Sequence, residues 1–164
     1  METITIRIYR DDVYQEVAKA TDYTGSKLID EDEGARDRIL AADDDLEELG
    51  RFWDESVLAT NENFKELLVS GVTKVLAASG SAGVSSSART GYEAVMEVSK
   101  SFDKVLASSV ESTLRSFFIA SIIGQWFKFA NKGESQDYFH QGAELMDTAE
   151  RLLYSRRKPT LPKD

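Results

Sequence analysis

The sequence predicts a mainly α-helical fold with a small β element, in which a core of about four helices is joined by an N-terminal strand and a central strand or hairpin. Apolar and polar side chains alternate over residues 3–9, which is the pattern of a half-buried strand. Apolar side chains recur with a helical rhythm over 46–67 and again over 138–153, which indicates two amphipathic helices. A further segment, 109–129, contains twelve consecutive uncharged residues and predicts a helix that several neighbours must cover.

The N-terminal strand leads into a predicted helix. The three isoleucines of the strand share one face, and Asp11 or Asp12 is placed to cap a helix over residues 12–23. The apolar residues of this helix form one inward stripe, and Gly25 is expected to end it.

An acidic segment precedes the long helix in the middle of the chain. Residues 30–34 are expected to form a loop and 36–41 a short helix. Asp44 and Glu47 have the spacing of a capping box and open a helix that is expected to continue to Leu67. Its acidic residues then lie on the outer face near the N-terminus, where the helix dipole favours them.

The centre of the chain carries the β signals. Residues 69–78 fit either a strand or the tail of the preceding helix, and the Ser- and Gly-rich segment 79–90 predicts a flexible loop or hairpin tip. Alternation over 92–99 predicts a further strand. We expect the N-terminal strand to pair with one of these central strands.

Two antiparallel helices complete the predicted domain. The uncharged helix is expected to break at 131–133, and the last helix begins near Ser135. Two prolines near the end of the chain exclude any further helix. The sequence therefore predicts a single domain over 1–155, followed by an extended arm over 156–164.

The charge of the chain is unevenly distributed. Residues 30–55 hold twelve acids and three arginines, a net charge of −9 that equals the charge of the whole chain. A candidate acidic face comprises Asp43, Asp44, Asp45, Glu47 and Glu48, and the candidate basic end comprises Arg156, Arg157 and Lys158. This asymmetry permits head-to-tail attraction between copies. The alternative is a solvated helix face and a frayed tail.

The motifs of common catalytic and metal sites are absent from the sequence. An EF-hand reading of the acidic segment fails because Gly34 is fifth rather than sixth and Ala41 occupies the position of the bidentate glutamate. Asp137, His140 and Glu144 share a helix face, but a di-iron bundle needs two histidines and the chain has one. We expect a surface polar stripe there. No catalytic, cofactor or metal residue is predicted, and the protein is not expected to be an enzyme.

The uncharged helix supplies the candidate protein interface. A membrane-spanning helix needs about 20 apolar residues, so the twelve-residue run is too short. We expect neighbouring copies of the chain to cover part of it, at Phe118, Ile122, Trp126 and Phe127. The N-terminus lacks the layout of a secretion signal, which favours the cytosol.

The C-terminal third resembles the head–tail connector (adaptor or head-completion) proteins of tailed bacteriophages. The resemblance covers about 95–157 and rests on the helix VESTLRSFFIASIIGQWF, whose apolar run ends in Trp126-Phe127, and on the closing helix that ends LLYSRR. It implies a structural virion protein, assembled in the bacterial cytoplasm, that forms a homo-oligomeric ring between the portal and the tail or a neighbouring connector protein. It also implies that DNA passes through the ring without sequence-specific binding and that no membrane is involved.

A second function remains open from the residues alone. The protein is then a helical adaptor or regulatory protein of the bacterial cytosol that binds a basic partner through its acidic face. A monomer that does not bind portal rings would favour this alternative.

Overall fold

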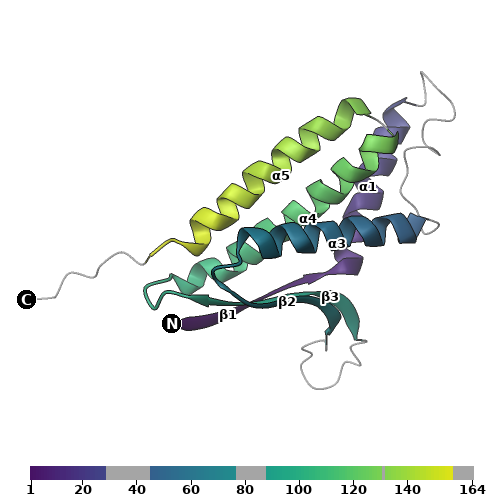
Figure 1. Cartoon of the computed structure of the whole chain (residues 1–164). Helices are drawn as coiled ribbons and strands as arrows, with labels where there is room; N and C mark the ends of the chain where they lie inside the picture. Colours follow the sequence, from purple (N-terminus) through teal and green to yellow (C-terminus); the bar gives the residue numbers. More distant parts are fainter. Residues whose placement is uncertain (29–44, 77–87, 131, 157–164) are drawn as a thin grey trace, which may run out of the picture.

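The computed structural model describes residues 1–28, 45–76, 88–130 and 132–156. The elements follow in the order β1 (Glu2–Tyr9), α1 (Arg10–Leu28), α3 (Leu46–Asn63), β2 (Leu68–Leu76), β3 (Arg89–Val98), the short 3-10 helix η2 (Lys104–Leu106), α4 (Ala107–Ala130) and α5 (Lys132–Leu153). Figure 1 shows the helices stacked on one face of a small sheet. The predicted class, mainly α with a small β element, is confirmed.

The sheet has three antiparallel strands in the order β1-β3-β2. Ile4, Ile6 and Ile8 of β1 pair with alternate residues of β3, and both sets of side chains are buried beneath the helices. The predicted half-buried strand and its pairing with a central strand are therefore confirmed. Residues 69–78 prove to be strand through Leu76, as part of β2.

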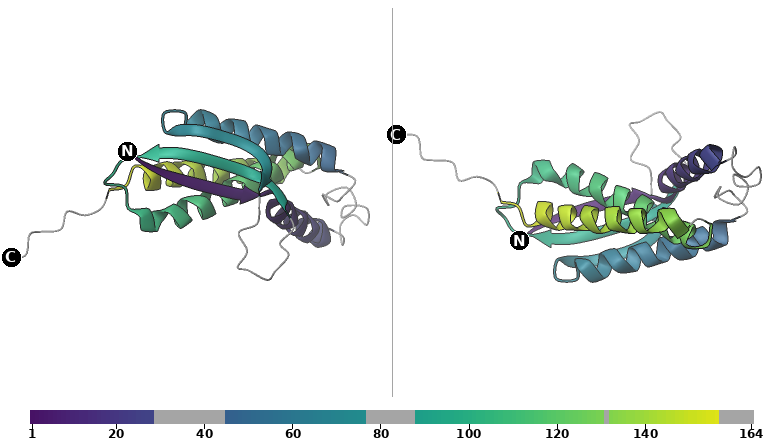
Figure 2. Two further views of the ribbon diagram at one scale, coloured as in Figure 1. Left: turned by 90° about the horizontal axis from the view of Figure 1, so that it is seen from below. Right: turned by 90° about the horizontal axis from the view of Figure 1, so that it is seen from above.

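The helices form two layers over the sheet. The helices α1, α3 and α4 contact the strands, whereas α5 packs on α4 and is the layer farthest from the sheet. Gly124 permits this packing, because a Cβ atom there would lie 3.0 Å from two ring carbons of Phe139. Seen from below in Figure 2, the strands lie in front of the helices, so no helix covers the other face of the sheet among the residues that the structure describes.

The helix α4 occupies the centre of the molecule. Its buried residues are Val110, Leu114, Phe117, Phe118, Ala120, Ile122, Ile123, Gly124 and Phe127. The helical segment Lys104–Ala130 is long and apolar enough to cross a membrane, although the uncharged run of twelve residues had appeared too short. Of its most apolar 18-residue stretch, 39% is buried inside the protein. Core helices meet the same criteria, and α4 packs against α1, α3, α5 and β1. Packing inside the chain buries nine residues of α4.

Several predicted boundaries were wrong by a few residues. The helix α1 continues through Gly25 to Leu28, since a glycine inside a helix costs only about 1 kcal/mol. The helix α3 ends at Asn63 rather than Leu67, because the buried Phe64 turns the chain toward β2. The last helix begins three residues before Ser135, and β3 begins at Arg89, inside the predicted loop.

Asp45, not Asp44, precedes the first residue of α3, and its side chain makes no capping hydrogen bond. Asp44, the predicted capping residue, lies outside the described residues, so the capping box stays a prediction. The acidic loop at 30–34, the short helix at 36–41, most of the predicted loop at 79–90 and the arm beyond residue 156 lie outside the described residues.

Candidate functional site

The predicted interface on α4 is wrong for three of its four residues. Phe118, Ile122 and Phe127 are 0% exposed in the single chain. The ring of Phe118 lies 4.9 Å from the ring of Trp53 and 5.5 Å from that of Tyr92, between centroids. The chain's own helices and sheet cover these side chains, so no second copy can reach them while the fold is intact. Trp126 is partly buried and packs against the same core.

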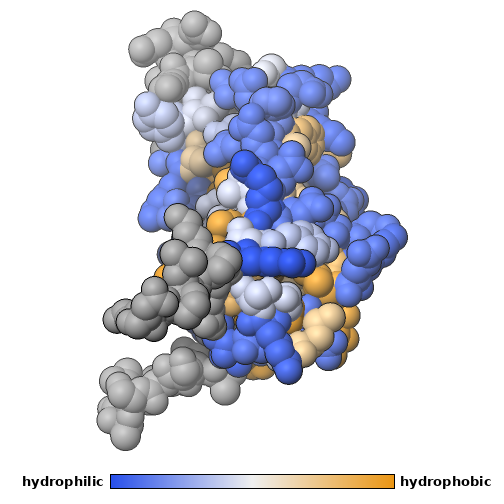
Figure 3. Space-filling view, turned by 90° about the vertical axis from the view of Figure 1, so that its left-hand side faces the viewer, coloured by the Kyte–Doolittle hydropathy of each residue, from blue (hydrophilic) through white to orange (hydrophobic). Residues whose placement is uncertain are grey.

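The charged candidates lie at the surface, apart from one another. Glu47 and Glu48 are exposed in the first turn of α3, and Asp45 is partly buried just before it. Arg156 is exposed and its backbone pairs with Phe102, at the end of the molecule where the N-terminus lies. Asp43, Asp44, Arg157 and Lys158 lie outside the described residues. Figure 3 looks at this end, where hydrophilic residues cover most of the face and apolar atoms are visible between them.

The predicted polar stripe on α5 is a surface feature. Nε2 of His140 lies 3.2 Å from Oε1 of Glu144, and both side chains are largely exposed. Within the described parts of the chain, no group of three or more His, Cys, Asp or Glu side chains is arranged to hold a metal ion.

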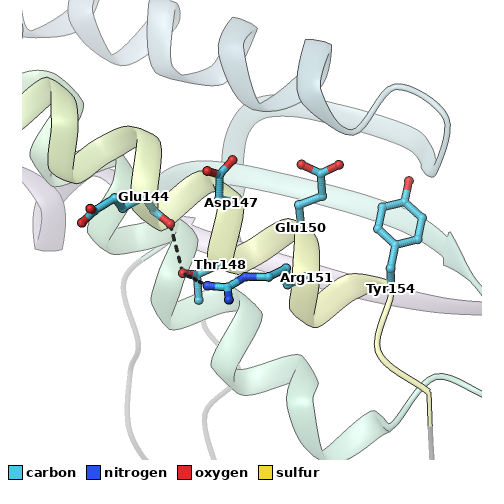
Figure 4. A pocket seen from close by; sticks show the side chains of 6 residues that line it. All are labelled: Glu144, Asp147, Thr148, Glu150, Arg151 and Tyr154. Carbon is cyan, nitrogen blue, oxygen red and sulfur yellow. Dashed lines mark hydrogen bonds between the residues drawn. The ribbon is translucent and has the colours of Figure 1, made fainter.

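A hollow of about 700 Å³ follows the last turns of α5 (Figure 4). Its lining comprises Glu144, Asp147, Thr148, Glu150, Arg151 and Tyr154. Oγ1 of Thr148 donates a hydrogen bond to the carbonyl oxygen of Glu144 and accepts one from Arg151. Because five of the residues come from α5 and the sixth, Tyr154, directly follows it, the hollow is open to solvent and does not surround a ligand.

The outer strand β2 carries unusual apolar exposure. Val69, Val72 and Val75 are 61%, 49% and 66% exposed. An apolar strand at the edge of a sheet is a typical site of association with another chain. This surface is not evident from the sequence, because the valines of β2 do not follow the two-residue period that marks a strand.

A charged cluster lies beside Val72 on the uncovered face of the sheet. The carboxylate of Glu93 accepts a hydrogen bond from Lys74 Nζ at 2.6 Å on one oxygen and from Arg7 Nε at 3.0 Å on the other. The hydrogen bond from Lys74, followed by that from Arg7, lowers the pKa of Glu93. The three side chains tie the three strands together and keep this face polar next to Val72.

A groove, here called the α1–α4–α5 groove, lies on the outside of α4. One part, of about 380 Å³, is lined by Asp12, Gln15 and Glu16 of α1 with Arg115, Ser116 and Ile119 of α4. The next part, of about 150 Å³, is lined by Ser116, Ile119, Ala120 and Ile123 of α4 with Tyr138 and Gln141 of α5. Because Ser116 and Ile119 line both parts, the two form one continuous depression.

Comparison with protein-family models, with curated proteins and with solved structures gave no match for this chain.

Proposed function

We propose that the protein is a non-enzymatic structural subunit that forms a homo-oligomeric ring of the head–tail connector type, between the portal and the tail of a phage virion. The observation that carries the proposal is the exposed apolar strand β2 on a protomer whose core is otherwise closed. The ring surface proposed here is therefore β2, and α4 is the rigid centre of each subunit.

The packing of the protomer suits assembly from folded subunits. Its core combines side chains from the sheet and from α1, α3, α4 and α5. A single copy therefore buries six large aromatic side chains without help: Trp53, Phe64, Tyr92, Phe102, Phe118 and Phe127. Three exposed valines on an outer strand remain as apolar surface that contact with another chain would remove from water. Ring formation needs two different surfaces on each subunit, and β2 supplies one of them.

The charge of the chain is compatible with a DNA passage. The whole chain carries −9 and residues 156–164 contribute +3, which leaves −12 for the remainder. Glu47 and Glu48 belong to that remainder and are exposed. A surface with this excess of carboxylates repels phosphates, which favours movement of a duplex past it without tight binding.

The test is the oligomeric state of the full chain, measured by mass photometry across a concentration series and by negative-stain microscopy with purified portal rings. We expect closed rings of uniform size that attach to the portal. The double substitution of Val72 and Val75 by lysine should raise the concentration needed for assembly at least tenfold, because it places charges on the apolar strand. Leu58→Lys, on the outside of α3 at a side chain that is 68% exposed, is the matched control and should assemble normally.

Two outcomes contradict the proposal. A chain that stays monomeric at high concentration and does not bind portal rings is not a connector subunit. If that monomer instead binds a basic protein, and Glu47→Lys with Glu48→Lys abolishes the binding, the adaptor function replaces the ring.

A further inference from the structure

We propose that the α1–α4–α5 groove binds the C-terminal arm, residues 157–164, of a neighbouring copy of the chain. The inference rests on the proposed ring and names the second surface that such a ring requires. It differs from the head-to-tail contact predicted from the sequence, in which the arm meets the acidic start of α3.

The groove offers an apolar floor between polar walls. Ile119 lies on the floor and is partly exposed, next to Ala120. The carboxylates of Asp12 and Glu16 stand on the α1 wall, where they outnumber the one cation of the lining, Arg115 of α4. Gln15 of α1 and Gln141 of α5 also line the groove. Such a surface accepts an extended segment that combines apolar and basic side chains.

The two carboxylates of the α1 wall remain accessible to a further cation. Asp12 pairs with Arg89 at 3.1 Å and Glu16 with Lys19 at 3.3 Å. All four side chains are more than a third exposed, and exposed pairs of this kind contribute little to stability. A lysine of an incoming segment can therefore share or replace these partners at little cost.

The sequence of the arm matches the groove in chemistry. Residues 157–164 read RKPTLPKD, in which Leu161 stands between two prolines and basic residues flank the apolar part. Prolines restrict the unbound segment to extended conformations, which reduces the entropy lost on binding. Leu161 is suited to the floor at Ile119, and the lysines are suited to the carboxylates of α1.

The distance between the start of the arm and the groove indicates that the arm binds a neighbouring copy. Arg156 and Met1 line the same hollow, so the arm leaves the molecule at the Glu2 end of β1. Asp12 follows the opposite end of this eight-residue strand, about 23 Å away at 3.3 Å per residue. Leu161 is five residues beyond Arg156 and reaches at most about 17 Å from it. Leu161 of the same copy therefore cannot enter the groove beside α1.

The same conclusion follows from α5. Gln141 precedes Leu153, the last residue of α5, by twelve residues, a distance of about 18 Å along the helix axis. An arm that folded back on its own copy would have to be almost fully extended for Leu161 to arrive at Gln141. A second copy has no such limit, because its arm can approach from outside.

Photo-cross-linking in the full chain tests the proposal. Leu161→p-benzoylphenylalanine is produced in ordinary and ¹⁵N-labelled forms, which are mixed, allowed to assemble and irradiated. We expect cross-linked peptides that join one ordinary and one labelled copy, and we expect them to map to α1 and α4 around Gln15 and Ile119. Cross-links confined to one copy, or to positions outside the groove, overturn the proposal.

Charge reversal locates the docking site without risk to the fold. Glu16→Arg, at an exposed position of the groove wall, should reduce the cross-linking yield about tenfold. Glu47→Arg, an identical change at the exposed start of α3, should leave the yield unchanged. The reverse result would place the arm on α3 and overturn the proposal.

A binding measurement separates this inference from the ring itself. A synthetic peptide of residues 156–164 is titrated into the full ¹⁵N-labelled chain, at concentrations where the protein is monomeric. We expect shifts in the side-chain amide signals of Gln15 and Gln141, whether or not rings form. Absence of these shifts overturns the groove proposal, and shifts in a chain that never forms rings support the groove while contradicting the ring.

Discussion

The indole Nε1 of Trp53 donates a hydrogen bond of 2.9 Å to Oγ1 of Thr73. This bond joins the middle of α3 to the outer strand β2. Asn61 adds a second connection about two helix turns further along α3, where its side-chain amide donates a hydrogen bond of 2.9 Å to the carbonyl oxygen of Gly71. The strand that we propose as the ring surface is thus fixed to the core by polar contacts.

Replacing Trp53 by phenylalanine should remove this tie and part of the packing against Phe118. We expect a loss of about 2–4 kcal/mol in the free energy of unfolding, since the change leaves a cavity in the core and removes the hydrogen bond to Thr73. Urea denaturation followed by circular dichroism measures it. A double-mutant cycle with Thr73→Val separates the hydrogen bond, and a coupling energy near zero would show that the bond contributes nothing.

Gly91→Ala should destabilise the sheet. A Cβ atom at this position would lie 2.6 Å from the backbone carbonyl oxygen of Ile8, which cannot move without disturbing the pairing of β1 with β3. We expect a loss of about 1–3 kcal/mol, measured as a lower denaturation midpoint. Gly50→Ala is the matched control, because nothing lies within 4 Å of its Cβ position and alanine favours the helix by about 1 kcal/mol. Equal effects of the two substitutions would contradict the packing described here.

Low pH should reduce the stability of the protein through Glu93, on the uncovered face of the sheet. Its pKa is lowered from the ordinary 4.5 by the hydrogen bonds from Lys74 and Arg7, so its ionised form is favoured by folding. The resulting stability is complete above pH 4.5 and is lost as the pH falls through the lower, folded-state pKa. We expect Glu93→Gln to lose stability relative to the parent at pH 6 and to approach the parent at pH 2–3. A constant difference across this range would exclude the ionic origin.

Ile122→Ala should reduce the stability of the single folded subunit, and its effect should not be limited to assembly. Ile122 is fully buried, and truncating an isoleucine in a core costs about 2–5 kcal/mol. The loss should be visible in dilute, monomeric protein by chemical denaturation. Leu58→Ala, at an exposed position of α3, should change stability by less than about 0.5 kcal/mol. A normal unfolding midpoint for Ile122→Ala would restore α4 as an interface.

The helices and strands can be predicted from the periodicity of the sequence, but their tertiary arrangement cannot. Alternation identifies β1 and β3 because both bury one face against helices, whereas β2 escapes notice because its valines point to solvent. The apolar composition of α4 shows that the helix must be covered but not by which chain. That answer depends on how closely α5 approaches, which Gly124 and Phe139 decide together.

The candidate site was still less accessible to sequence reasoning. The groove unites Glu16, Arg115 and Gln141, which belong to three helices and are far apart along the chain. None of them belongs to a recognisable motif, and each looks like an ordinary surface residue of an amphipathic helix. The basic arm is visible in the sequence, but the place where it docks is a property of the packed helices.

Met1 and Arg156 line one hollow of about 450 Å³ at the same end of the molecule. Few residues would be needed to bridge them, so a circularly permuted chain is a realistic engineering target. A fluorescent label attached ahead of Met1 would also sit beside the root of the arm. Energy transfer from a label at the N-terminus would therefore report the movement of the arm toward another molecule.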